Sequence, residues 1–197
     1  MHALRRTLSI GLILAAPALD LDGGIVRTIQ EHRTPAADRV MTFMTRVGSP
    51  AVVLGGVLLI ALTAPPAGVI TARAAIVSLL ATNIVAETLK WAIARPRPDG
   101  SHSRANSSFP SSHAANAYAI ATLLADRWPV AGPAMWITAA VISFSRVYLN
   151  RHYPSDVLGG MLIGWGISSA VLARRRRFTE GWPWERERRR EGSDGSG

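Results

Sequence analysis

Five apolar stretches occupy the middle of the chain and constrain its fold more than any other feature. They cover roughly residues 50–66, 68–89, 113–126, 131–149 and 156–173. None of them shows the polar face that a surface helix of a soluble protein turns toward water. A soluble all-helical bundle with very apolar helices is therefore disfavoured. The pattern predicts an all-α fold, an integral membrane helical bundle.

The N-terminal region contains a shorter apolar stretch, LSIGLILAAPAL, at residues 8–19. A membrane span needs about 20 residues, so the flanking residues would have to extend this one. Alternatively, it is a cleaved signal peptide, because Ala-Pro-Ala at 16–18 fits a cleavage site. We expect a retained helix, which brings the total to about six transmembrane helices. Residues 20–49 are polar with apolar residues at helical spacing, and we expect them to lie on the membrane surface.

Charge is distributed unevenly along the chain. There are 22 basic against 13 acidic residues, and a basic segment, RRRRFTEGWPWERERRR, fills 174–190. The basic residues cluster beside apolar stretches and are not interleaved with aromatic residues on a polar domain, which disfavours nucleic acid as a partner. Because cysteine is absent, the chain has no disulfide or thiolate metal site. We divide the chain into a first membrane helix and interfacial segment (1–49), a transmembrane core (50–173) and a basic cytoplasmic tail expected to be disordered (174–197).

The same charges predict the orientation of a multi-pass protein of the cell membrane. The basic tail and the two arginines before the first apolar stretch favour the cytoplasm, which requires an even number of spans. Loops 90–112 and 150–155 then face outward. Loop 90–112 nevertheless carries several cations against a single carboxylate, Asp99; they are Lys90, Arg95, Arg97 and Arg104. Basic residues normally lie in cytoplasmic loops, so a cluster of them in an outward-facing loop indicates that they bind an anionic ligand.

Three polar segments at helix ends are expected to meet on one side of the membrane. They are 90–98, 110–113 and 145–156. From residue 113 the chain crosses once, turns near 128 and crosses back by 149, so the three segments share a side whatever happens to the first stretch.

The residue types in these segments suit a phosphate. Lys90, Arg97 and Arg146 supply three positive charges, and the planar fork of arginine matches phosphate oxygens. Ser111 and Ser112 stand at an expected helix start, where unpaired backbone N–H groups favour an anion. Arg146 alone can also be explained by snorkelling toward headgroups.

Two histidines and a carboxylate accompany these cations. His113 stands where a proton donor is needed, and His152 precedes Asp156 by four residues, with a helix start expected at Pro154. At that spacing the carboxylate can accept from one ring nitrogen, leaving the other free to attack. A metal site formed by the three is disfavoured because the neighbouring arginines repel a cation. Arg95, Arg104 and Arg151 are interpreted as headgroup or solvent contacts.

The three segments together resemble a known signature. They resemble, in order along the chain, the three motifs of the type 2 phosphatidic acid phosphatase superfamily. The matching residues are Lys90-x6-Arg97-Pro98, Pro110-Ser111-Ser112-His113 and Ser145-Arg146-x5-His152-x3-Asp156. That group contains membrane lipid phosphatases and, as soluble relatives, vanadium haloperoxidases. The resemblance covers about residues 68–173. The family's usual glycine is replaced by Ser112, which restricts the backbone if a positive φ is required there.

The resemblance implies a role for each matched residue. Lys90, Arg97 and Arg146 would hold the phosphate, with Ser111 and the backbone around Ser112 completing the cradle. His152 would be the nucleophile that forms a phosphohistidine, oriented by Asp156. His113 would protonate the leaving oxygen, and neither a metal nor another cofactor would be needed.

These considerations predict a membrane lipid phosphatase whose site faces outward, with undecaprenyl diphosphate or a similar polyprenyl diphosphate as the favoured substrate. The alternatives are a phosphatase of phosphatidic acid or phosphatidylglycerol phosphate, a vanadate-dependent halide oxidase, and a catalytically inactive phospholipid-binding membrane protein. The oxidase is disfavoured because its known examples are soluble, and the inactive protein because every expected catalytic position is filled.

Overall fold

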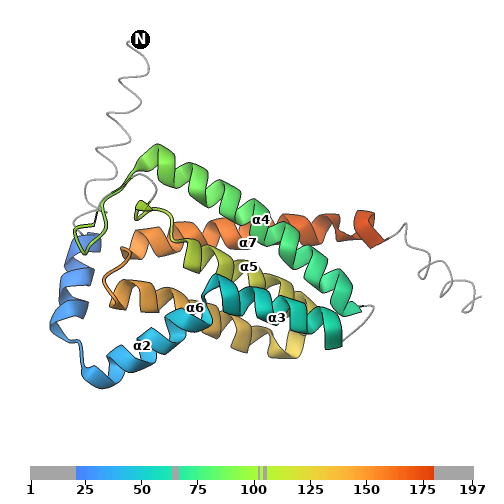
Figure 1. The fold of residues 1–197 in the computed structure, drawn as a ribbon, viewed down its shortest axis with the longest axis horizontal. Helices are drawn as coiled ribbons and strands as arrows, with labels where there is room; N and C mark the ends of the chain where they lie inside the picture. Colours follow the sequence, from blue (N-terminus) through green and yellow to red (C-terminus); the bar gives the residue numbers. More distant parts are fainter. Residues whose placement is uncertain (1–20, 64–66, 102, 104–105, 180–197) are drawn as a thin grey trace, which may run out of the picture.

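The computed structural model describes residues 21–63, 67–101, 103 and 106–179, and these residues contain helices and no strands. A helical segment at 21–31 comes first. It is followed by α2 (Pro35–Val47), α3 (Pro50–Thr63), α4 (Ala67–Ile93), α5 (Ser112–Arg127), η2 (Pro129–Ala131), α6 (Gly132–Tyr148) and α7 (Pro154–Thr179) (Figure 1). All five apolar stretches are thus helical within the described residues, which leave out 64–66. The expected helix at 8–19 and the tail beyond 179 lie outside the described residues.

Not every helix is long enough to cross a membrane by itself. Within the described residues three are: Gly68–Ile93, Pro129–Tyr148 and Pro154–Arg174. The pair α2 and α3, bent by 53° at their junction, raises the number to four if it counts as one span. With 14 and 16 residues, α3 and α5 are shorter than the roughly 20 that a span needs. The membrane class is supported, and the expected count of about six transmembrane helices is not confirmed.

The short helix α5 lies in the middle of the bundle, against α4, α6 and α7 (Figure 1). Its buried face consists largely of alanine: Ala114, Ala115, Ala117, Ala119 and Ala121. Glycines of α7 face it, since a Cβ at Gly160 would collide with the carbonyl oxygen of Ser111 and one at Gly164 with that of Ala115. Backbone therefore packs directly on backbone, which is how helices associate in lipid, where apolar burial gives little driving force.

The outer surface of the bundle carries large exposed apolar side chains, as a lipid-facing surface requires. They include Leu54, Leu58 and Leu62 of α3, Leu80 and Ile84 of α4, and Leu158, Leu162 and Trp165 of α7. Helix α2 has no buried residue and exposes Val40 and Phe43. The membrane-surface position of 20–49 stays a prediction.

Four helix ends meet at one end of the bundle, on the left in Figure 1. There α4 and α6 end, and α5 and α7 begin. Helix α7 runs from this end to the opposite one, where the described chain stops. The three polar segments therefore share one end, as the parity of the crossings predicts.

Candidate active site

The end of α4 places two cations at this end of the bundle. Lys90 lies in the last turn, is 8% exposed, and its Nζ donates to Glu87 Oε1 at 2.7 Å. The helix stops at Ala94, whose φ of 51° is unusual for a residue other than glycine. Arg97 follows in the loop, where its Nε donates to the carbonyl of Asn106 at 3.0 Å. Two of the three cations expected to bind phosphate, Lys90 and Arg97, are thus fixed in place by hydrogen bonds.

The start of α5 places the second polar segment beside them. Ser111 is the N-cap, its hydroxyl accepting from the N–H of Ala114 at 3.4 Å. Its own N–H donates to the carbonyl of Asp156 at 3.0 Å, which joins the start of α5 to α7. Ser112 Oγ donates to Glu87 Oε1 at 3.3 Å. His113 makes no hydrogen bond among the described residues and lies within electrostatic reach of the other site residues: Arg146, His152, Lys90 and Arg97.

A helix-ending motif joins α6 to the third segment. The N–H of Arg151 donates to the carbonyl of Arg146 at 2.9 Å, and that of Asn150 to the carbonyl of Val147 at 3.0 Å. Asn150 has a φ of 60°, so the turn is a Schellman motif with asparagine at the left-handed position. The N–H of His152 also donates to the carbonyl of Arg146, at 3.2 Å. This turn brings His152 back beside Arg146.

The guanidinium of Arg146 is held on one side only. Its Nη1 donates to Thr45 Oγ1 of α2 at 2.6 Å. Its Nε is buried and has no hydrogen-bond partner among the described residues. Because a buried donor without a partner is costly, this edge of the guanidinium is suited to a ligand.

His152 is 3% exposed and its ring is oriented by a backbone carbonyl. Nδ1 lies 2.7 Å from the carbonyl oxygen of Ser108. A carbonyl only accepts, so Nδ1 carries the proton in the neutral ring and Nε2 keeps its lone pair. Burial lowers the pKa of His152 from its ordinary value, the charges of Arg97 and Arg146 lower it further, and Asp156 opposes the shift. The ring is thus held in the neutral form that a nucleophile requires.

Asp156 lies beside His152 without bonding its ring. The distance from Nδ1 to Oδ2 is 3.8 Å, too long for a hydrogen bond. The carboxylate instead accepts from the N–H of Tyr153 at 2.8 Å, Nη1 of Arg95 at 2.6 Å and the hydroxyl of Ser108. The bond to Tyr153 caps α7, which begins at Pro154 as expected.

Two expectations from the sequence are therefore corrected, the bond from the His152 ring to Asp156 and the position of Arg95. Arg95 is no headgroup or solvent contact, because its side chain is 13% exposed and pairs with two carboxylates. The sequence reasoning also missed Ser108, whose hydrogen bond to His152 comes from the backbone and leaves no side-chain pattern to detect. Nor do His113, His152 and Asp156 assemble as metal ligands: the described residues contain no group of three His, Cys, Asp or Glu that could hold a metal ion.

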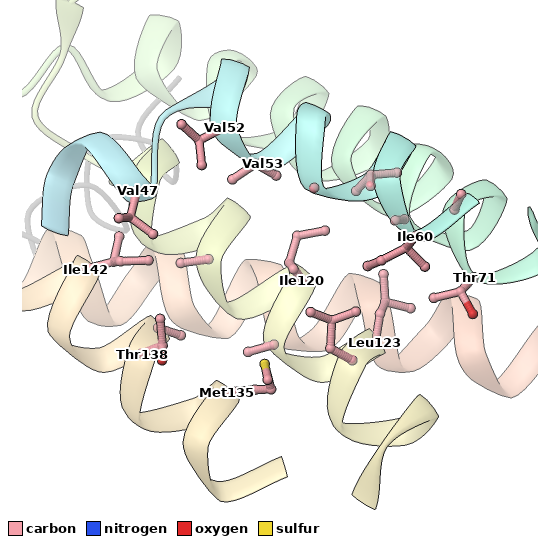
Figure 2. Close-up of a pocket in the computed structure, with 18 residues that line it drawn as sticks. Val47, Val52, Val53, Ile60, Thr71, Ile120, Leu123, Met135, Thr138 and Ile142 are labelled. Atoms are coloured by element: carbon pink, nitrogen blue, oxygen red, sulfur yellow. The ribbon is translucent and has the colours of Figure 1, made fainter. Parts of the chain in front are cut away.

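An apolar cavity of about 210 Å³ lies between the helices, and its lining includes Ala117, about one turn along α5 from His113. Figure 2 shows its lining, which includes Val47, Val53 and Ile60 on one side and Ile120 and Ile142 on the other. At Gly48, a Cβ would collide with Ile142, which lines the cavity, and would lie 3.7 Å from His113 Cδ2. A side chain other than hydrogen would therefore not fit where the α2–α3 corner approaches His113.

Comparisons with known proteins bear on the family and the fold of the chain. The model of the PAP2 superfamily matches residues 71–180. A lipid A 1-phosphatase of Porphyromonas gingivalis is 40% identical over 79 residues, 38% of this chain and 17% of that protein. The undecaprenyl-diphosphatase BcrC of Bacillus subtilis is 28% identical over 141 residues, 67% of this chain and 72% of that protein.

A solved structure shares the fold. It is a transmembrane PAP2-type phosphatidylglycerolphosphate phosphatase of Bacillus subtilis, with a TM-score of 0.70 and 24% identity, over 92% of this chain and 100% of that one.

Proposed function

This chain belongs to the PAP2 superfamily, and from that membership we propose that it is a membrane lipid phosphatase that works without a metal ion. The observation that carries the proposal is the convergence of three cations and two histidines at one end of an apolar bundle. Lys90, Arg97 and Arg146 all lie close enough to His113 to act on it electrostatically, and Arg97 and Arg146 also act on His152. Positive charge held at a buried site can stabilise a phosphoryl group in the role that Mg²⁺ takes in other enzymes.

The proposed reaction has two displacements at phosphorus. In the first, Nε2 of His152 forms a bond to phosphorus while the bond from phosphorus to the leaving oxygen breaks, and His113 gives that oxygen its proton. Burial and the neighbouring cations lower the pKa of His113 to about 4 in the free site, so this step requires the negative charge of the bound phosphate to raise that pKa and keep His113 protonated. In the second, water attacks the phosphohistidine, the phosphorus–nitrogen bond breaks, and His113 recovers a proton from the water. The products are inorganic phosphate and either a lipid alcohol or, from a diphosphate, a lipid monophosphate.

A lipid substrate is favoured by the surroundings of the site. The apolar cavity lies between α3 and the pair α5 and α6, and its lining includes Ala117, about one turn along α5 from His113. An apolar chain in this cavity would extend from a headgroup at the site. Undecaprenyl diphosphate is our first choice, because the match to BcrC, which carries the name undecaprenyl-diphosphatase, extends over 67% of this chain. Phosphatidic acid or phosphatidylglycerol phosphate is the alternative.

We further propose that the site faces outward and that the C-terminus is cytoplasmic. The site and the C-terminal end of α7 lie at opposite ends of that helix (Figure 1), and the basic residues after 173 favour the cytoplasm. A reporter fused after residue 173 should read cytoplasmic. An external signal would show that the protein has the opposite orientation in the membrane.

The test of activity is phosphate release by the purified protein in detergent with EDTA present. Undecaprenyl diphosphate, phosphatidic acid and phosphatidylglycerol phosphate are compared at equal concentration, and His152→Ala protein purified identically controls for contaminating phosphatases. We expect release from at least one lipid, fastest from the diphosphate. Release from none would refute the proposal and favour the inactive phospholipid-binding protein, and loss of activity with EDTA would indicate a metal enzyme.

A further inference from the structure

Arg95 joins three separate parts of the chain through its side chain. Nη1 donates to Asp156 Oδ1 at 2.6 Å and to Ser155 Oγ at 2.7 Å, both in the first turn of α7. Nη2 donates to Asp22 Oδ2 at 2.9 Å, in the helical segment 21–31. The guanidinium carbon lies 4.2 Å from the centre of the Tyr153 ring. Both terminal nitrogens of this guanidinium thus donate to protein groups, and its face lies over an aromatic ring.

The backbone of Arg95 holds the loop that orients the nucleophile. Its N–H donates to Ser107 Oγ at 3.0 Å, and its carbonyl accepts from the N–H of Ser108 at 2.8 Å. Ser108 is the residue whose carbonyl accepts from His152 Nδ1. Its hydroxyl also donates to Asp156, which Arg95 binds. Arg95 therefore fixes Ser108 twice, once through the main chain and once through Asp156.

Asp22 completes the assembly from the far side. Its Oδ1 accepts from the N–H of Ser155 at 3.0 Å, and its Oδ2 accepts from the Ser155 hydroxyl as well as from Arg95. Asp22 is 4% exposed and Asp156 is fully buried. The two buried carboxylates compensate the positive charge of the Arg95 guanidinium. Replacing any one of these three residues would leave a buried charge without its partner.

We propose that Arg95 is a positioning residue for the nucleophile and that Asp22 anchors it. This role rests on the proposed function. Arg95 holds the Ser108 carbonyl against His152 Nδ1, whereas Arg97 and Arg146 contact the phosphate and Arg95 does not. The segment 21–31 then takes part in the reaction without contacting the substrate.

The experiment compares Arg95→Gln, Arg95→Lys, Asp22→Asn and a matched control. The control is Arg151→Gln, since Arg151 is also a loop arginine paired with a carboxylate, Asp99, but its side chain is 54% exposed. The assays measure kcat and KM on the lipid substrate and the inhibition constant of inorganic phosphate. A misplaced reacting group lowers the rate by up to about 100-fold.

We expect Arg95→Gln to lower kcat about 10- to 100-fold while the KM and the inhibition constant of phosphate change less than about twofold. Arg95→Lys should recover part of kcat because it keeps the charge but not the fork. Asp22→Asn should lower kcat less, and Arg151→Gln should leave it unchanged. Undiminished kcat in Arg95→Gln would overturn the inference. An inhibition constant that rises as kcat falls would overturn it too, by making Arg95 a phosphate ligand.

A second readout does not depend on turnover. Nitrogen NMR of protein labelled at histidine, with the His152 signals assigned by their loss in His152→Gln, reports which ring nitrogen carries the proton. The intact protein should show the Nδ1–H form at pH 8, and Arg95→Gln should show a mixture of both forms. If the intact protein released no phosphate, the proposed function would fail and the NMR comparison would still decide the positioning role. If Arg95→Gln did not fold, Arg95→Lys and Asp22→Asn would decide it by the same measurements.

Discussion

Replacing Gly164 by alanine tests whether the close approach of α7 to α5 supports both the fold and the site. A Cβ at Gly164 would lie 2.9 Å from the carbonyl carbon of Ala115 and 3.0 Å from the nitrogen of Ala119, besides colliding with the Ala115 oxygen. Ordinary contacts between such atoms are about 3.5–4.0 Å. All three obstructing atoms belong to helix backbone, so no side-chain rotation can relieve the contact. The helices must move apart by more than about 1 Å at this point, because the Ala115 oxygen is the nearest of the three atoms.

Gly166→Ala is the matched control, two residues along the same helix, where an added Cβ meets nothing within 4 Å. Both substitutions gain the same helix propensity, about 1 kcal/mol, so their difference isolates the steric cost. Overpacking of this kind costs about 1–3 kcal/mol. At about 2–4 °C per kcal/mol for a chain of this size, Gly164→Ala should melt roughly 2–12 °C below Gly166→Ala.

The assay is thermal unfolding of both variants in the same detergent, followed by kcat. Separation of the helices also lengthens the 3.0 Å hydrogen bond from the Ser111 N–H to the Asp156 carbonyl. Gly164→Ala should therefore lose at least half of its activity at a temperature where it is still folded. Equal melting temperatures for the two variants would refute the reasoning.

Three further predictions follow from the site. His152→Ala should abolish turnover and leave no phosphohistidine in acid-quenched protein incubated with labelled substrate; a near-normal rate would exclude His152 as nucleophile. Because His152 must be neutral to attack and its pKa lies below the ordinary 6.5, the acid limb of kcat/KM should fall below pH 6.5, and a limb above that value would contradict the burial argument. The same shift makes the contribution of His152 to stability complete above pH 6.5 and lost as the pH falls through the lowered pKa. Thr45→Val removes the acceptor 2.6 Å from Arg146 Nη1 and should raise the inhibition constant of inorganic phosphate about three- to tenfold, whereas an unchanged constant would show that Thr45 does not position Arg146.

Much of the architecture could be predicted because its causes are local. The five apolar stretches correspond to the helices α3 to α7. Serine and proline indicated the starts of α5 at Ser112 and of α7 at Pro154. The parity of the crossings then placed the three polar segments together. The number of spans was less accessible, because hydropathy does not distinguish a short helix enclosed by others, such as α5, from one that crosses the bilayer alone.

The partners of the site residues could not be predicted, for two physical reasons. The acceptor for His152 is a main-chain carbonyl, which every residue possesses. Arg95 pairs with Asp22, 73 residues earlier, and no local pattern connects two positions so far apart. Asp156 was identified as a site residue from its spacing, yet that spacing also suits the capping of α7, and its carboxylate accepts a hydrogen bond from the Tyr153 N–H.

The length of α4 links this site to the thickness of the surrounding bilayer. With 27 residues, α4 is about 40 Å long, some 10 Å more than a typical hydrocarbon core. Such a helix either tilts or extends beyond the core, and Lys90 lies at the end that moves when it does. A thicker membrane draws that end inward and a thinner one leaves it farther out among the headgroups. The height of the cationic site above the acyl chains is therefore set partly by the lipids, and turnover measured in bilayers of graded acyl length should pass through an optimum.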